Sequence, residues 1–396
     1  MPDSAFRDTA EWHSARAVGK RLALHLQQTD ELADAVVHDF TSMRPGAGMI
    51  LLSRILAQGR DAVPDAPQSL VDLLASMETE PLWLDWDEID LGASAFMRAG
   101  AFGAAALLCH SLPIGYLDPL SSKPLIFSGR LVERAPRRLM ETARFVYECC
   151  QPGGMRRSGR GFHICVRVRL MHAQVRRLLL KSGRWNAGLW GQPISEFHLL
   201  GTNVFFSLAV VDALRRWGIY ISSREEQAIF SLWRYNGFLM GISSEVLPAN
   251  LSEARRILNS LELSRERANE KSVELMQALL DAGAELSEKI LHVNIQNLVR
   301  AALGGLVRNL LGETRADELG LPRNIFRFLP LLWWPVLRSI EFLRLCIPGS
   351  RRLAVYIGTY LWQWSVNAGL QGRDASFAIP QRMHGERLPG GNSNAR

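Results

Sequence analysis

Apolar residues recur at spacings of three and four along most of this chain, the pattern of helices that bury one face. The pattern predicts helices at residues 13–43, 67–79, 93–111, 135–150, 162–182, 197–217, 223–240, 250–260, 270–283 and 285–312. Strand signals are sparse: residues 83–86 give a short one, and no regular series of hairpins follows. The chain is therefore predicted to be all-α.

Capping residues support several of these boundaries. Ser195, Ser222 and Asn250 each stand just before a predicted helix, with a glutamate one to three residues further on. Gly183 and Gly218 follow predicted helices, at positions where glycine commonly ends them. These residues set the predicted starts and stops.

No segment has the composition of an interdomain linker, so we predict one large domain. Within it, residues 91–250 form a core, residues 1–90 form an N-terminal helical extension packed on that core, and residues 251–371 complete the domain. Residues 372–396 are polar and rich in glycine and proline, which predicts a disordered tail.

Composition narrows the classes of protein. The 396 residues are 47% hydrophobic, enough for a large core, and the formal net charge is +7. No basic tract alternates with aromatic residues, so nucleic acid is not an expected partner, and the arginines are expected to pair with acidic side chains on helices. The five cysteines, which lack the spacing of a disulfide framework, predict buried thiols in a reducing compartment. They are Cys109, Cys149, Cys150, Cys165 and Cys346.

Membrane and targeting signals are weak. The first 20 residues are polar and lack the apolar stretch of a secretory signal, so we expect a cytoplasmic protein. Residues 326–347 carry three arginines, a glutamate and two prolines, which argues against a membrane span. A peripheral membrane contact remains an alternative, through an amphipathic helix at 328–345 anchored by Trp333 and Trp334. The Gly/Ala-rich residues 95–113 are expected to pack closely against another helix.

His172 is the main candidate for chemistry. Val168 and Val175 flank it at helical spacing, so one imidazole interrupts an apolar helix face. Arg169 and Arg176 lie on the same side. An imidazole, an apolar slot and nearby cations are what a haem needs for its iron and its propionates. The alternative is a core histidine hydrogen-bonded to a neighbour.

Arg138 and Thr142 supply a second candidate pair. They are four residues apart and therefore share one helix face with Phe145. A buried Arg/Thr pair could orient dioxygen or hold a propionate, and the alternative is two ordinary polar residues near a helix start. His110, His163 and His198 are weaker signals, the last as a neighbour of a helix cap.

Motifs for other enzyme classes are absent. The sequence has no H-E-x-x-H, no G-x-S-x-G, no phosphate-binding G-x-x-x-x-G-K-[ST] and no G-x-G-x-x-G after a strand. Zincin, α/β-hydrolase, nucleotidase and Rossmann functions therefore lack their main evidence.

The candidate residues belong to an ordered series of motifs that resembles the latex-clearing protein (rubber oxygenase)/MpaB-type oxygenase family. The series is Arg138-Leu139-x-x-Thr142, Gly153-Gly154, Val168-Arg169-x-x-His172-Ala173-x-Val175-Arg176, Trp190-Gly191-x-Pro193-Ile194, Thr202, Phe205-Phe206-Ser207 and Trp233-Arg234-x-x-Gly237-x-x-Met240-Gly241. The resemblance implies a globin-like helical core with additional helices and one haem b. It implies that His172 is the proximal iron ligand, with Arg138 and Thr142 near the haem.

The implied activity is dioxygen-dependent cleavage of a carbon–carbon double bond in isoprenoid material. Two departures from the pattern bear on the substrate. Rubber-cleaving members place a lysine before the motif threonine, where this chain has Glu141. Their upstream acidic residue falls on Ser122, with Asp118 and Glu133 as the nearest carboxylates. A catalytic base is thus not transferable, and we expect a smaller hydrophobic substrate than rubber.

Two other functions stay open at this stage. One is a haem-binding protein without turnover, such as a sensor. The other is a membrane-associated helical protein in which His172 is a core residue. The oligomeric state is not predicted.

Overall fold

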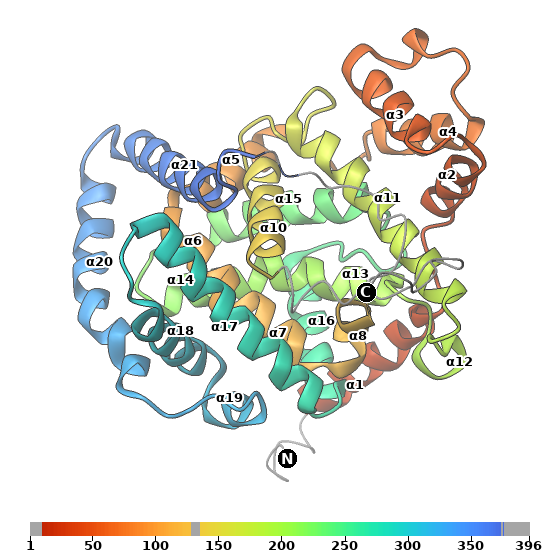
Figure 1. Cartoon of the computed structure of the whole chain (residues 1–396). Coiled ribbons are helices and arrows are strands. Elements are labelled where there is room, and N and C mark those ends of the chain that lie inside the picture. Colours follow the sequence, from red (N-terminus) through yellow and green to blue (C-terminus); the bar gives the residue numbers. More distant parts are fainter. Residues whose placement is uncertain (1–9, 128–134, 374, 376–396) are drawn as a thin grey trace, which may run out of the picture.

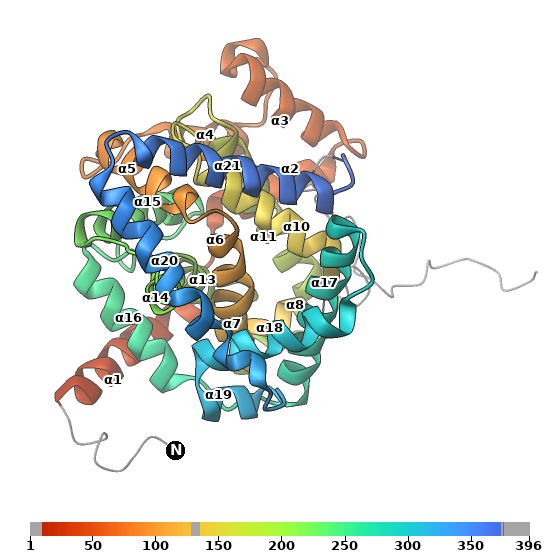
Figure 2. The ribbon, with the colours of Figure 1, turned by 90° about the vertical axis from the view of Figure 1, so that its left-hand side faces the viewer.

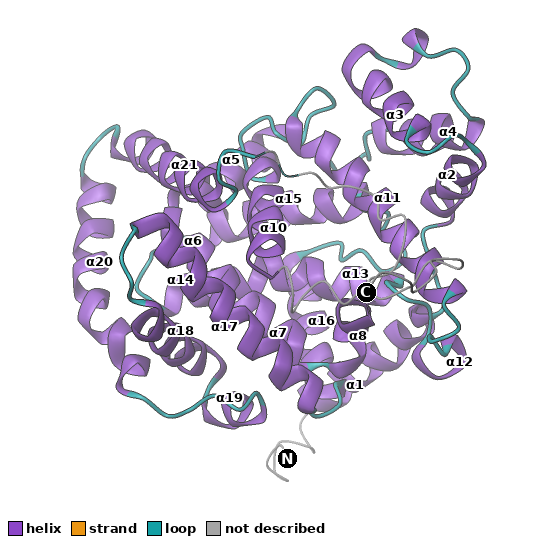
Figure 3. Cartoon of the chain, viewed as in Figure 1, coloured by secondary structure: helices purple, strands orange, loops and turns teal. Residues whose placement is uncertain are grey.

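Helices are the only regular elements among residues 10–127, 135–373 and 375, which are the residues that this computed structural model describes (Figures 1 and 3). The all-α, single-domain prediction is confirmed. Most of the tail predicted to be disordered after residue 371 lies outside these residues, as does Glu133. The internal boundaries at residues 90 and 250 stay predictions.

The helices have the following bounds. The first group is α1 (Ala10–Ala23), α2 (Glu31–Ser42), α3 (Ala47–Gln58), α4 (Gln68–Glu78), α5 (Trp86–Arg98), α6 (Gly100–Ala106), α7 (Leu112–Leu117) and α8 (Pro119–Phe127). The middle group is α10 (Ala135–Cys149), α11 (Arg160–Lys181), α12 (Ala187–Trp190), α13 (Glu196–Val204), α14 (Val210–Arg216) and α15 (Ser223–Leu239). The last group is α16 (Leu251–Ser264), α17 (Glu270–Leu291), α18 (Gln296–Leu311), α19 (Glu313–Glu318), α20 (Leu329–Cys346) and α21 (Ser350–Gly369). Two π-helical segments, η4 (Leu107–Ser111) and η5 (Phe205–Ala209), continue α6 into α7 and α13 into α14.

Several predicted boundaries hold and others move. Ser222 and Glu225 form the capping box expected at the start of α15. The predicted helix 13–43 is two helices, because Asp30 caps α2 by accepting a hydrogen bond from the Ala33 amide at 3.2 Å. Gly283 does not end α17. A Cβ atom there would lie 2.7 Å from Leu303 Cδ1, so this glycine allows α18 to approach.

Two long apolar helical segments are largely buried in the molecule. Gly100–Leu117 and Glu196–Arg216 are both long and apolar enough to cross a membrane, yet 56% and 78% of their most apolar windows are buried inside the protein. Side-chain-to-backbone hydrogen bonds join their π-helical segments η4 and η5. The His110 Nδ1 atom lies 2.8 Å from the Ala209 carbonyl oxygen, and the Ser111 hydroxyl donates to the Phe205 carbonyl oxygen at 2.8 Å. Both segments are therefore core helices of this fold.

The Gly/Ala-rich segment packs closely against another helix, as predicted. A Cβ atom at Gly103 would lie 2.7 Å from the Trp362 ring of α21, and one at Gly358 would lie 2.2 Å from the Met97 carbonyl oxygen. The segment is interrupted at Gly100, whose φ of +52° favours glycine. This contact seats α21 across the ends of α5 and α6.

The cysteines are free thiols, and the prediction that they are buried is confirmed for all but Cys346. Cys346 is exposed because α20 lies at the edge of the molecule, where it contributes little to the core (Figure 1).

Candidate functional site

A cavity of about 900 Å³ lies among α1, α7, α8, α10, α11, α13 and α16. Its volume is at the upper end of the range for small-molecule sites, roughly 300–1,000 Å³. Most of its wall is apolar, with side chains that include Leu112, Ile114, Phe145, Val168 and Phe206. The cavity therefore suits a large hydrophobic ligand with a few polar contacts.

His172 lines this cavity from α11, between Val168 and Val175. Its Nδ1 atom is buried and has no hydrogen-bond partner. Burial, chiefly, and the nearby Arg176 and Arg138 charges lower the pKa of His172 to about 4, although Asp30 opposes them. The remaining accessible area of the side chain faces the cavity. The imidazole is neutral at physiological pH, the form in which histidine binds metals.

Arg138 and Thr142 line the same cavity from α10, together with Phe145. Helical spacing on α10 explains why these residues share a face. The Arg138 charge adds to the lowering of the His172 pKa, by less than burial and Arg176 do. The structure thus brings together three predicted site residues from two helices.

Arg169 and Arg176 are placed differently from the prediction. Arg169 donates to both carboxylate oxygens of Asp30 from Nε and Nη2, at 2.5 and 2.9 Å. Arg176 Nε donates to Asp34 at 3.0 Å, and its Nη1 donates to the Ile194 carbonyl oxygen at 2.8 Å. Neither arginine lines the cavity. Their main hydrogen bonds instead join α11 to α2 and to the loop before α13.

That loop contributes a residue that the motif series contained but that sequence reasoning gave no role. Ile194 lines the cavity with φ of +52°, a conformation that is costly for a β-branched residue, by roughly 1–3 kcal/mol. Arg176 holds its carbonyl, and the neighbouring Gln192 amide donates to the Leu26 carbonyl oxygen at 2.7 Å. The Arg176 contact fixes part of the cavity wall.

His198 is a second buried imidazole in the cavity wall. The Ser195 amide donates to its Nδ1 atom at 3.3 Å, which confirms the expected cap contact. Because Nδ1 accepts, the proton of the neutral ring sits on Nε2, and Nε2 is buried without a partner. Burial lowers the pKa of His198 to about 4, against the opposing charge of Asp118. His198 therefore carries a buried hydrogen-bond donor without a partner in the cavity wall.

The positions that depart from the rubber-cleaving pattern also line the cavity, and each has a local partner. The Ser122 hydroxyl donates to the Pro119 carbonyl oxygen at 3.3 Å. The Asp118 carboxylate accepts from the Leu120 and Ser121 amides, both at 3.2 Å, at the start of α8. Glu141 pairs with Arg137 at 3.1 Å. None of these contacts singles out a catalytic base.

Within residues 10–127, 135–373 and 375, no group of three or more His, Cys, Asp or Glu side chains is arranged to hold a metal ion. A site with several protein ligands, such as a structural zinc site, therefore has no support in this part of the chain. A haem iron differs, because the porphyrin supplies most ligands and the protein need supply only one.

Comparisons with known proteins agree with this geometry. The family model for "ER-bound oxygenase mpaB/B′/Rubber oxygenase, catalytic domain" matches residues 91–338, which include all the motifs above. Rubber oxygenase from Streptomyces sp. (strain K30) is 24% identical over 318 residues, 78% of this chain and 74% of that protein. A structure of latex clearing protein LCP in the closed state matches with a TM-score of 0.67 at 22% identity, covering 86% of this chain and 90% of that one.

Proposed function

Because this chain belongs to the family of mpaB/B′ and rubber oxygenases, we propose that it is a haem b-dependent oxygenase that uses dioxygen to cleave or oxidise a carbon–carbon double bond. The observation that carries the proposal is the neutral His172 imidazole, whose buried Nδ1 atom has no hydrogen-bond partner, in the wall of a largely apolar cavity. Bound there, haem would supply the iron chemistry that activates dioxygen.

The residues present fit this cofactor. His172 is the candidate iron ligand, because its buried Nδ1 atom has no partner and its ring is neutral. Arg138 is an arginine of the cavity wall on the neighbouring helix α10, suited to a propionate or to dioxygen. Thr142, one turn further along α10, adds a hydroxyl donor. Arg169 contributes indirectly, by fixing α11 on α2 through Asp30.

The substrate is proposed to be a hydrophobic alkene, such as an isoprenoid or unsaturated lipid chain. Phe145, Val168 and Phe206 give the cavity apolar surface that excludes water from such a chain. The Nε2–H donor of His198 would suit a substrate that carries an oxygen atom at one end. The finite volume of the cavity favours a molecule smaller than rubber. The free, mostly buried cysteines support the further proposal that the protein acts in a reducing compartment, the cytoplasm.

An absorption spectrum of the purified protein after expression with haem supplied tests the cofactor. We expect a Soret band that His172→Ala abolishes. His163→Ala is the matched control, because His163 lies on the same helix but outside the cavity wall, and it should keep the band. Absence of the band from the unmodified protein would refute haem binding, and full haem in His172→Ala would refute the ligand assignment.

Oxygen uptake tests turnover separately. A prenyl-chain alkene should stimulate uptake, whereas its fully hydrogenated analogue should not. A protein with a Soret band and no uptake on any unsaturated lipid would be a haem-binding protein without this activity, such as a sensor.

A further inference from the structure

The last two helices expose an unusual amount of apolar surface. α20 and α21 follow each other across one face of the molecule, which Figure 2 shows toward the viewer. The α20–α21 face is defined here by Leu331, Leu332, Phe342, Leu345, Tyr356 and Tyr360, each at least 59% exposed. Large apolar side chains at this density on consecutive helices are rare on the surface of a monomer unless something binds them.

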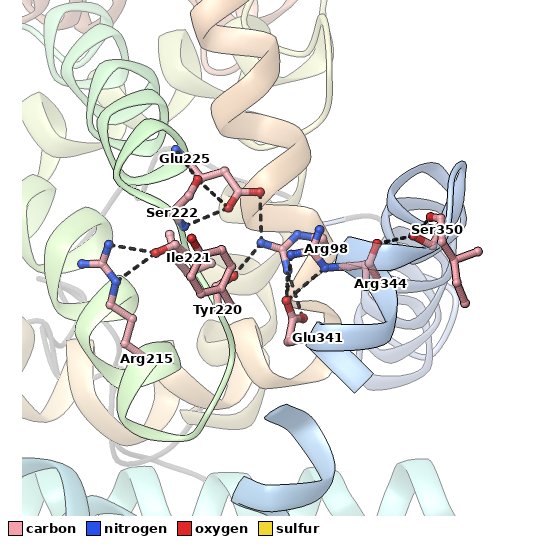
Figure 4. Close-up of polar contacts among 10 residues, drawn as sticks. Arg98, Arg215, Tyr220, Ile221, Ser222, Glu225, Glu341, Arg344 and Ser350 are labelled. Atoms are coloured by element: carbon pink, nitrogen blue, oxygen red, sulfur yellow. Dashed lines mark hydrogen bonds and ion pairs between the residues drawn. The ribbon is translucent and has the colours of Figure 1, made fainter. Parts of the chain in front are cut away.

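Hydrogen bonds on the inner side of α20 orient this face toward the outside. Buried Arg98 of α5 donates from Nη1 to both oxygens of Glu341 at 3.0 Å, and Arg344 Nε donates to Glu341 at 3.0 Å (Figure 4). Arg98 Nη2 also donates to the Tyr220 carbonyl oxygen and to Glu225, at 2.9 and 3.1 Å. The network fixes which side of α20 turns inward.

Trp333 also lies on the inner side of α20. Its ring packs edge-on against Phe102 and Trp217, at centroid distances of 5.8 and 6.0 Å. Of the two predicted tryptophan anchors for a membrane, Trp333 therefore faces the protein, whereas Trp334 is 44% exposed. With its polar and aromatic contacts turned inward, α20 presents its other apolar residues to the outside.

The exposed charged side chains of α20 and α21 have one sign. Residues 325–373 contain six arginines and a single acidic residue, Glu341, which the inner network engages. Arg338, Arg351 and Arg352 are exposed, and the Arg338 guanidinium lies 5.5 Å from the centre of the Trp334 ring. Exposed leucine, phenylalanine, tyrosine and tryptophan bordered by arginines are the composition of helices that lie in the interface of an anionic membrane.

We propose that the α20–α21 face docks the protein on an anionic lipid surface, with the two helices lying in the headgroup region and not spanning the bilayer. A second copy of this chain is the main rival occupant. In a two-fold dimer the same patch meets itself, which would bring the exposed arginines of both copies together without exposed carboxylates from this segment to balance them. An anionic membrane supplies that missing charge.

Vesicle co-sedimentation of the full chain tests the proposal, with phosphatidylcholine vesicles compared with vesicles that also contain phosphatidylglycerol. We expect binding to the mixed vesicles. Placing two charges on the face in L332E/F342E should lower the partition coefficient at least about tenfold, because each side chain gives up apolar burial. R351Q/R352Q should weaken binding to the anionic vesicles more than to the neutral ones.

The matched control is L82E/L189E, because Leu82 and Leu189 are 107% and 77% exposed and lie on other elements. This variant should bind vesicles like the unmodified protein, and circular dichroism should show that all three double variants fold. The proposal fails if the unmodified protein does not bind vesicles, or if L332E/F342E binds as well as the control. It also fails if the unmodified protein is a dimer without lipid that L332E/F342E converts to a monomer, because the occupant is then a second copy.

Discussion

Arg169 donates two hydrogen bonds to the carboxylate of Asp30, at 2.5 and 2.9 Å. The two residues are 139 positions apart in the sequence, and both side chains are buried. The pair ties α11, which carries His172, to the first residues of α2. Gly241 lies against it: a Cβ atom there would be 2.7 Å from Asp30 Oδ2, and its φ is +84°. Three segments of the chain thus meet at one ion pair close to the cavity.

Asp30→Asn should destabilise the protein strongly. Asparagine can still cap α2 for the Ala33 amide, so the substitution mainly removes the charge that balances buried Arg169. Leaving one charge of a buried pair without its partner costs about 3–5 kcal/mol, which urea unfolding at pH 7 would measure.

Asp34→Asn is the matched control for that variant. Asp34 pairs with Arg176, but its side chain is 35% exposed, so water replaces part of the lost interaction. We expect a loss of about 1 kcal/mol or less. Equal losses in the two variants would contradict the special weight given to the Arg169–Asp30 pair.

His198 should make the free energy of unfolding fall as pH drops from 6.5 to 4. Burial lowers its pKa from 6.5 to about 4, so between these values the unfolded chain binds a proton that the folded protein excludes. This contribution is complete above pH 6.5 and is lost as the pH falls toward the folded pKa. It amounts to about 1.4 kcal/mol per pH unit inside the window.

His198→Asn removes this titration and keeps an acceptor for the Ser195 amide. Urea unfolding across the same pH window should therefore show a slope smaller by about 1.4 kcal/mol per pH unit than in the unmodified protein. An unchanged slope would mean that His198 is protonated as easily in the folded protein as in the unfolded chain.

Arg138→Gln tests the proposed activity at the cavity. Loss of a positioned cationic donor should lower turnover about 100-fold, measured as alkene-dependent oxygen uptake per haem. The control is Arg137→Gln, because Arg137 precedes Arg138 on α10 and also borders the cavity, but its side chain is 43% exposed and pairs with Glu141. If both variants lose activity equally, general charge near α10 matters and the placement of Arg138 does not.

Local pattern was enough to predict part of the fold and site. α11 and α15 lie within two residues of their predicted bounds, because apolar periodicity and, for α15, the Ser222–Glu225 capping box act within one helix. The same spacing brought Arg138 and Thr142 onto one face of α10, and that face borders the cavity.

What the pattern could not provide was the identity of distant partners. Spacing placed Arg169 and Arg176 on the His172 side of α11, but their carboxylate partners lie 139 and 142 residues away, at the cap and in the first turn of α2. The predicted helix 270–283 is eight residues too short, because α17 continues through Gly283 to Leu291, and only the position of Leu303 shows that this glycine serves packing. Contacts between distant helices depend on how those helices pack against each other, and the residue pattern of one helix does not determine that packing.

The crossing of α5 and α15 gives a final test of that kind. Gly92 of α5 is buried, and a Cβ atom there would lie 2.1 Å from the Ala228 carbonyl oxygen of α15. Gly92→Ala should therefore push the helices apart and cost about 1–3 kcal/mol of unfolding free energy.

Gly115→Ala on α7 is the matched control, because nothing lies within 4 Å of its Cβ position and the new methyl group would enter the cavity wall. Alanine favours the helix over glycine by about 1 kcal/mol, so that variant should be as stable as the unmodified protein or more so. If urea unfolding gave both variants the same stability, the close crossing of α5 and α15 at Gly92 would be wrong.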